Sequence, residues 1–146
     1  SRMQLGYLPE RPYFQEALSG EEFLRYLARL SGLSPSKMEA RIDYVLKRVG
    51  MSSSRKKLLR HFSKGMLQRI GIAQALLHDP KLLILDEPMS GLDPIGRREI
   101  RDLIGELAAE GKTIFFSSHV IPDVEAVCDE VALIERGRII KQGSLG

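Results

Sequence analysis

Apolar positions along the chain follow the spacing of helices in its first half. Residues 19–32 and 34–50 each place apolar side chains three and four positions apart, which predicts two amphipathic helices. Ser19, with Glu22 three residues later, has the pattern of a capping box at the start of the first helix. We therefore expect residues 16–62 to be mainly helical.

The remainder of the chain alternates short apolar runs with further helical patterns. The expected strands are residues 3–8, 82–85, 113–117, 131–134 and 138–142, and the expected helices are residues 67–77, 94–111 and 124–128. Strands that alternate with helices in this way usually form a parallel sheet covered by those helices. The pattern therefore predicts an α/β fold.

The apolar run Leu82–Leu85 ends in two adjacent acids, Asp86 and Glu87. A buried parallel strand delivers such residues to its carboxyl end, where open α/β sheets bind their ligands. Phosphoryl transfer uses one carboxylate to hold Mg²⁺, usually through water, and a second to orient or deprotonate the attacking water. Asp86 and Glu87 suit these two roles, although acids at this place often only cap the next helix.

Two further segments could act on a phosphate. His119 follows the strand 113–117, so its imidazole is expected at the same sheet edge, where it could contact a terminal phosphate or be an ordinary loop residue. Ser63 and Lys64 precede the helix 67–77, and a helix start offers free N–H groups and a positive dipole end to an anion. The alternative is a simple helix cap, in which Ser63 contributes about 1 kcal/mol of stability.

Composition narrows the choice of partners. The 146 residues are 43% hydrophobic and carry 22 basic and 19 acidic side chains, a net charge of +3 that is too small to indicate nucleic acid. Cys128 is the only cysteine, which excludes an internal disulfide. No apolar stretch reaches the roughly 18 to 20 residues of a membrane-spanning helix, so we expect any membrane association to go through a partner.

Five motifs in a fixed order give the chain a family resemblance. They are Glu10, Ser63-Lys64-Gly65-Met66, Leu85-Asp86-Glu87, Ser90-Gly91-Leu92-Asp93 and His119. In this order they resemble the ATPase subunit of ATP-binding cassette (ABC) transporters, and the resemblance covers nearly the whole chain. It implies ATP and Mg²⁺ as cofactors, and the hydrolysis of ATP to power transport across a membrane.

The resemblance also implies a role for each motif. Glu87 would be the catalytic base, His119 the switch residue at the γ-phosphate, and Asp86 a magnesium-organising residue. Glu10, where the family usually has glutamine, would bind a magnesium-bound water and lie in the loop toward the membrane partner. The remaining site residues would meet the second ATPase subunit or the nucleotide that it holds: Ser63, Lys64, Gly65 and Met66 of the signature motif, and Asp93 of the crossing loop.

The implied fold is a partial P-loop NTPase core with a parallel sheet and an inserted helical subdomain. Residues 1–15 would form a core strand and the glutamine-loop equivalent, residues 16–62 the helical subdomain, and residues 63–146 the signature helix and the C-terminal part of the core. The implied partners are a transmembrane subunit and a second ATPase subunit, without nucleic acid. The implied location is cytoplasmic, peripheral on the inner face of the cell membrane.

The motifs depart from the family's commonest pattern at three positions. Lys64 replaces a glycine and Met66 a glutamine of the signature, a variant that resembles exporter-type subunits. Glu10 places a carboxylate, which repels phosphate, where an amide is usual. These differences leave the transported substrate open.

A phosphate-binding loop, Gly-x-x-x-x-Gly-Lys-Ser/Thr, does not occur in the sequence. The closest imitation, Gly105–Thr113, has five residues between its glycines and runs from a helix into a strand, the reverse of the required order. We therefore expect a C-terminal portion that is inactive alone and binds ATP weakly or not at all. The resemblance also places an absent strand beside residues 113–117, so we expect an open seam through which copies of the chain associate.

Two alternatives to the transporter ATPase remain. One is an ABC-type ATPase without a transport function, and the other is a non-catalytic interaction module in which the acids are vestigial. The retained Asp86, Glu87 and His119 count against the module. Long insertions or a second cassette, which would indicate the first alternative, do not occur in these residues.

Overall fold

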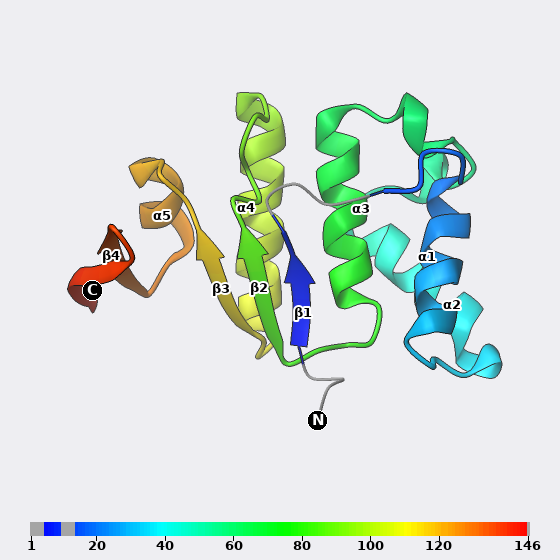
Figure 1. The fold of residues 1–146 in the computed structure, drawn as a ribbon, viewed down its shortest axis with the longest axis horizontal. Coiled ribbons are helices and arrows are strands. Elements are labelled where there is room, and N and C mark those ends of the chain that lie inside the picture. Colours follow the sequence, from blue (N-terminus) through cyan, green and yellow to red (C-terminus); the bar gives the residue numbers. More distant parts are fainter. Residues whose placement is uncertain (1–4, 10–13, 146) are drawn as a thin grey trace.

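The computed structural model describes residues 5–9 and 14–145 as an α/β structure (Figure 1). In chain order its elements are β1 (Leu5–Leu8), α1 (Gly20–Leu30), α2 (Pro35–Arg48), α3 (Lys64–Leu76), β2 (Leu82–Asp86), α4 (Pro94–Ala109), β3 (Thr113–Ser117), α5 (Ile121–Val127), β4 (Glu130–Glu135) and β5 (Arg138–Ser144). Two short 3-10 helices, Ser52–Ser54 and Leu59–His61, connect α2 to α3. Each helix and strand expected from the periodicity is present. Glu10 and the start of the first expected strand lie outside the described residues.

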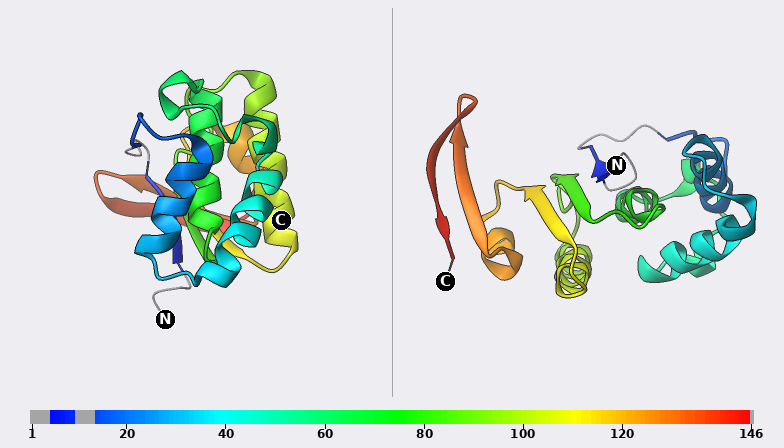
Figure 2. Two further views of the ribbon diagram at one scale, coloured as in Figure 1. Left: turned by 90° about the vertical axis from the view of Figure 1, so that its right-hand side faces the viewer. Right: turned by 90° about the horizontal axis from the view of Figure 1, so that it is seen from below.

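Three of the strands form a parallel sheet in the order β1-β2-β3. Its register pairs Leu8 with Leu85 and Asp86 with Ser117, so β2 and β3 end side by side. β4 and β5 form a separate antiparallel hairpin. The views in Figure 2 place this hairpin at the far end of the molecule from α1 and α2.

Three helices begin at residues whose side chains accept a hydrogen bond from the first turn. Ser19 and Glu22 form the expected capping box of α1. Ser63 Oγ accepts from the N–H of Met66, at 3.2 Å, and Asp93 Oδ1 accepts from the N–H of Gly96, at 2.7 Å. These bonds satisfy N–H groups that have no partner within the helix, and they fix where α3 and α4 begin.

A glycine lets α3 lie directly on β1. A β-carbon placed on Gly71 would lie 2.5 Å from Cδ1 of Leu8, closer than real carbon atoms approach. Leu8 itself is completely buried. The absence of a side chain at Gly71 therefore makes room for the Leu8 side chain between this strand and α3.

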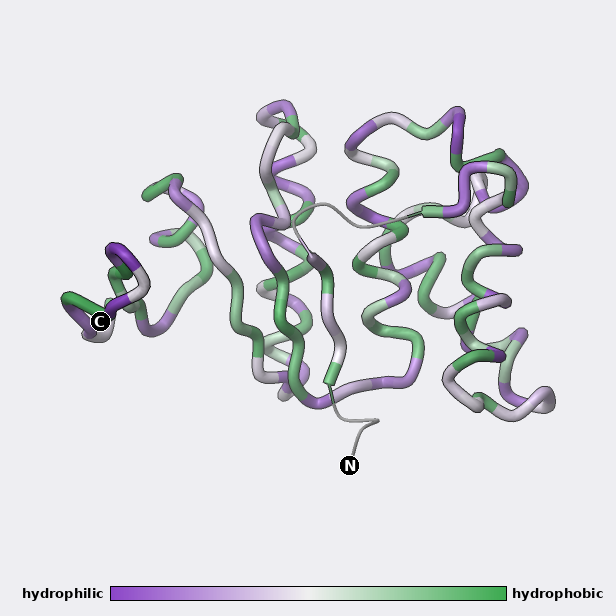
Figure 3. The backbone as a smooth tube through the Cα atoms, in the orientation of Figure 1, coloured by the Kyte–Doolittle hydropathy of each residue, from purple (hydrophilic) through white to green (hydrophobic). Residues whose placement is uncertain are grey.

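One hydrophobic core runs from the helical segment into the sheet. Its buried residues come from α1, α2, α3, β1, β2 and α4, and Figure 3 shows the apolar colouring along β2 and β3. Arg41 of α2 also donates to the carbonyl oxygens of Leu76 and Leu77, at 2.8 and 3.0 Å. The helical segment is thus joined to the remainder by shared packing, and the expected domain boundary at residue 62 stays a prediction.

The outer side of β3 and the hairpin are much less covered. Phe115 of β3 is 65% exposed, and Ile134 and Ile139 of the hairpin are exposed to a similar degree. The seam that the resemblance implied on this side stays a prediction. Among the described residues, no helix is both long and apolar enough to cross a membrane.

Candidate functional site

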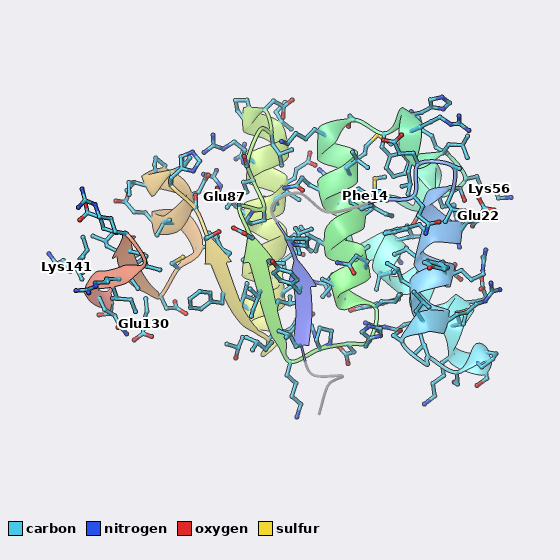
Figure 4. The ribbon with its side chains drawn as sticks, viewed as in Figure 1. Phe14, Glu22, Lys56, Glu87, Glu130 and Lys141 are labelled. Carbon is cyan, nitrogen blue, oxygen red and sulfur yellow. The ribbon has the colours of Figure 1, made fainter. Side chains whose placement is uncertain are left out.

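The two adjacent acids lie at the carboxyl end of β2, as expected. Asp86 is the last residue of the strand, and Glu87 follows with a positive φ of 50°, a left-handed conformation that is uncommon for any residue but glycine. The Glu87 side chain is only 18% exposed. Figure 4 shows Glu87 at the end of the sheet near which α3 and α4 begin.

Ser117, the last residue of β3, connects the two acids. Its hydroxyl donates to Asp86 Oδ1 at 2.6 Å and accepts from the backbone N–H of Glu87 at 3.0 Å. The serine was not expected from the sequence. The signal that could have identified it is the sheet register, which pairs Ser117 with Asp86.

His119 contacts the second acid. Its Nδ1 lies 2.9 Å from Glu87 Oε1, while the imidazole side chain is 78% exposed. The structure thus brings together two residues that are separated by 32 positions in the sequence. A carboxylate paired with an imidazole at a sheet edge can accept a proton from a bound water and hold its own orientation.

The start of α3 lies against the loop that follows the acids. A β-carbon on Gly91, whose φ is +75°, would lie 2.6 Å from Cε of Lys64, so the lysine side chain crosses directly over this glycine. A β-carbon on Gly65 would lie 3.7 Å from Cδ2 of Leu92. Two motifs that were predicted separately are therefore neighbours within one chain.

The side chains at the two helix starts already have local partners. Ser63 caps α3 and Asp93 caps α4, while Lys64 is exposed. Both helix starts lie at the end of the molecule toward which β2 and β3 run (Figure 1). An anion at the first turn of α3 would meet the positive end of the helix dipole and the N–H groups of that turn.

Gln68 of α3 is a second residue that sequence reasoning missed. It is a polar residue with only 4% of its surface exposed, and its Nε2 donates to the Pro88 carbonyl at 2.7 Å. A longer contact of 3.4 Å reaches the Glu87 carbonyl. The sequence signal that could have identified it is a polar glutamine at a helix position that faces the core, since a buried amide needs a hydrogen-bond partner.

A charge cluster ties the helix after His119 to α4. Asp123 of α5 is almost completely buried, and its carboxylate lies 2.6 Å from Nη2 of Arg97 and 3.4 Å from Nη1 of Arg101. Burying a carboxylate is costly unless it is paired. The two arginines therefore fix α5, and with it the segment that follows His119.

The carboxylates at the sheet edge suit magnesium better than a metal ion whose ligands all come from the protein. Within residues 5–9 and 14–145, no three histidine, cysteine, aspartate or glutamate side chains converge to hold a metal. Mg²⁺ usually keeps several waters and takes one or two carboxylates together with substrate phosphates. Asp86 and Glu87 meet this requirement, whereas Glu10 lies outside the described residues.

Comparison with known proteins identifies the family. The family model described as "ABC transporter" matches residues 1–90, more than half of the chain. The chain belongs to the ABC transporter family. An ABC transporter ATP-binding protein of Synechocystis sp. is 47% identical over 99% of this chain and 42% of its own length. The bacitracin transport ATP-binding protein BcrA of Bacillus licheniformis is 45% identical over 95% of this chain and 45% of its own length.

The structural comparison agrees with the family. The solved structure of cbiO1 from Clostridium perfringens, described as part of the ABC transporter complex cbiONQ, superposes with a TM-score of 0.85 and 35% identity. The match covers 99% of this ABC family chain and 58% of cbiO1. The fold is that of ABC ATPase domains, with the parallel sheet of a P-loop NTPase. The chain spans less than half the length of the two curated relatives named above.

Proposed function

We propose that this chain is part of the ATP-binding and ATP-hydrolysing subunit of an ABC transporter, of the exporter-like type. The observation that carries the proposal is the contact between Glu87 and His119 beside Asp86, at the carboxyl edge of a parallel sheet. This arrangement places a proton acceptor and a magnesium-binding carboxylate next to each other. The names of the relatives, which include a bacitracin transport protein, support the same activity.

Each site residue has a proposed role. Asp86 holds Mg²⁺ through water, and Glu87 accepts a proton from the attacking water. His119 keeps the Glu87 carboxylate in position and, with Glu10, lies at the γ-phosphate. Bound Mg-ATP would supply the reactive phosphoryl group. The residues of the chain would bind and orient the phosphate and the attacking water, and would accept the proton of that water.

The Ser117 hydroxyl supports separate roles for the Asp86 and Glu87 carboxylates. Its O–H donates to Asp86, which fixes the orientation of this side chain as a metal ligand. Its oxygen accepts from the Glu87 backbone, which leaves the Glu87 side chain directed to His119. Neighbouring acids can thus act separately, one on the metal and one on the water.

The proposed partners are a transmembrane subunit and a second ATPase subunit. In this arrangement Ser63, Lys64, Gly65 and Met66 face the nucleotide held by the second subunit, and Asp93 lies in the loop that crosses to it. The exposed Lys64 and the capped start of α3 suit an anionic ligand. The subunit would be cytoplasmic and peripheral on the inner face of the membrane, as the description of cbiO1 as part of a transporter complex supports.

We expect the 146 residues alone to bind Mg-ATP weakly or not at all and to be inactive. The backbone N–H groups and the lysine of a Gly-x-x-x-x-Gly-Lys-Ser/Thr loop normally wrap the phosphates, and the sequence has no such motif. Titration calorimetry of this chain with Mg-ATP tests the expectation. A micromolar dissociation constant would contradict it.

The hydrolytic role is tested in a hybrid protein that joins these residues to the N-terminal part of an ABC ATP-binding protein that carries a Gly-x-x-x-x-Gly-Lys-Ser/Thr loop. We expect Glu87→Gln to lower its ATPase rate by about 100-fold or more, since a general base contributes roughly that factor. Glu125→Gln, at an exposed position of α5, is the matched control and should leave the rate unchanged. Equal rates for wild type and Glu87→Gln would instead favour the interaction module.

A further inference from the structure

We propose that Gln68 is a positioning residue for Glu87, and that α3 acts through its side-chain amide to set the catalytic carboxylate. The inference rests on the proposed function, because it assumes that Glu87 acts on water. It differs from that function in naming what holds Glu87 in place. The residue that does so comes from the helix whose first turn carries the signature motif.

The first argument is the pairing of a buried amide. Gln68 is 4% exposed, and its Nε2 donates to the carbonyl of Pro88 at 2.7 Å and approaches that of Glu87 at 3.4 Å. Burying an amide is unfavourable unless it is hydrogen-bonded. The amide therefore restrains the two peptide groups that follow the catalytic carboxylate.

The second argument is the conformation that these bonds restrain. Glu87 has a φ of +50°, which a side chain with a β-carbon adopts only when its surroundings hold it there. Ser117 binds the N–H of Glu87 from the sheet side, at 3.0 Å. Gln68 binds the following carbonyl groups from the helix side, so the turn is held between two elements.

The third argument is where Gln68 lies on its helix. It is five residues after Ser63, little more than one turn from the start of α3. In the same region, Lys64 crosses over Gly91 in the loop that follows Glu87. A displacement of the first two turns of α3 would therefore move both the turn at Glu87 and the loop after it.

The test compares two glutamines of the same helix. Gln68→Met keeps the length of the side chain and removes its donor, and Gln74→Met is the matched control because Gln74 Nε2 also donates to a backbone carbonyl, that of Tyr7 at 2.8 Å. NMR of the 146-residue chain would record the backbone amide signal of Glu87 and the imidazole Nδ1 signal of His119.

We expect Gln68→Met to shift both signals and to speed hydrogen exchange at the Glu87 amide, whereas Gln74→Met leaves them unchanged. Unchanged Glu87 and His119 signals in a folded Gln68→Met chain would overturn the proposal, since a purely structural glutamine would alter stability alone. Should Gln68→Met not fold, Gln68→Leu carries the same test, because it also removes the donor and places no charge beside the two buried carbonyl groups.

The hybrid protein separates this proposal from the proposed function. There we expect Gln68→Met to lower kcat by roughly 10- to 100-fold with little change in KM for ATP, because a misplaced catalytic group costs about that much. An unchanged kcat would overturn the positioning role. If Glu87→Gln has no effect in the same hybrid, the hydrolytic function fails, while the NMR result still decides whether Gln68 sets the conformation of Glu87.

Discussion

Single glycines determine how closely α3 approaches the sheet. A β-carbon on Gly6 of β1 would lie 2.3 Å from the carbonyl oxygen of Ala75 and 2.7 Å from Cδ2 of Leu83. The carbonyl belongs to a helix backbone and cannot move aside as the end of a flexible side chain could. Gly105 of α4, in contrast, has no atom within 4 Å of where its β-carbon would be.

We therefore expect opposite effects of the same substitution at these two glycines. Gly6→Ala should lower the free energy of unfolding by about 1 to 3 kcal/mol through overpacking. Gly105→Ala should raise it by up to about 1 kcal/mol, because alanine favours the helix. Urea unfolding of both variants measures the difference. Equal stability of Gly6→Ala and wild type would show that α3 and β1 are less closely packed than described.

His78 makes the stability of the chain depend on pH. Burial, and then the charge of Arg41, lower the pKa of His78, and its buried Nδ1 has no hydrogen-bond partner among the described residues. The unfolded chain, with a histidine pKa of about 6.5, then binds a proton at a higher pH than the folded chain does. Stability should fall as the pH drops below about 7 toward the folded pKa.

Unfolding measured at several pH values tests this expectation. His78→Gln should flatten the loss of stability between neutral and mildly acidic pH, since the group that takes up the proton is removed. His61→Gln, at an exposed histidine, should leave that loss as it is in the wild type. A pH dependence that is the same in His78→Gln and wild type would contradict the assignment.

At the scale of elements, a buried charge cluster joins α5 to α4. The α5 helix has only seven residues, too few to be stable without tertiary contacts. Its Asp123 is held by Arg97 and Arg101, one turn apart on α4. Because His119 lies just before α5, the cluster also limits how far the backbone at His119 can move.

We expect Arg97→Ala to destabilise the chain by about 2 to 4 kcal/mol, because it leaves the buried Asp123 carboxylate without its closest partner. Hydrogen exchange should rise first in α5 and in the segment around His119. Arg98→Ala, at the exposed neighbouring arginine, is the control and should cost little. A small effect of Arg97→Ala would show that Arg101 or water can replace it.

The elements themselves were predictable from the sequence because their signals are local. The apolar spacing gave α1 and α2, and Ser19 with Glu22 gave a helix start. Asp86 and His119 were also placed correctly at one sheet edge, since each directly follows a strand.

The partners of these residues were not predictable in the same way. Ser117 meets Asp86 only through the sheet register, and Gln68 meets Pro88 only because α3 packs beside β2. Both contacts join positions 20 or more residues apart. The periodicity of apolar residues does not indicate which residues so far apart in the sequence come into contact. Only the three-dimensional packing shows these contacts.

At the scale of the whole molecule, the sheet has one side that is poorly covered. The poorly covered face of the sheet exposes Phe115 and Tyr7, which the register places on the same face through Ile84, and the neighbouring hairpin exposes Leu133, Ile134, Ile139 and Ile140. Figure 2 shows this hairpin standing away from the three-stranded sheet. An open strand edge beside apolar side chains favours association with another chain.

We propose that copies of the 146-residue chain associate through this side. Light scattering should show a mean mass that rises with protein concentration above that of the 16.4 kDa chain. Phe115→Lys, which places a charge on the exposed edge strand, should reduce the association. A monodisperse monomer at every concentration would contradict the proposal.

The close contact of α3 with β1 has a mechanical consequence. The Leu8 side chain packs onto Gly71, and Gly6 lies against the backbone carbonyl of Ala75, so helix and strand interlock closely. We therefore expect amide hydrogen exchange in α3 and β1 to follow one common opening, and α1 and α2 to open separately at their own contacts with α3.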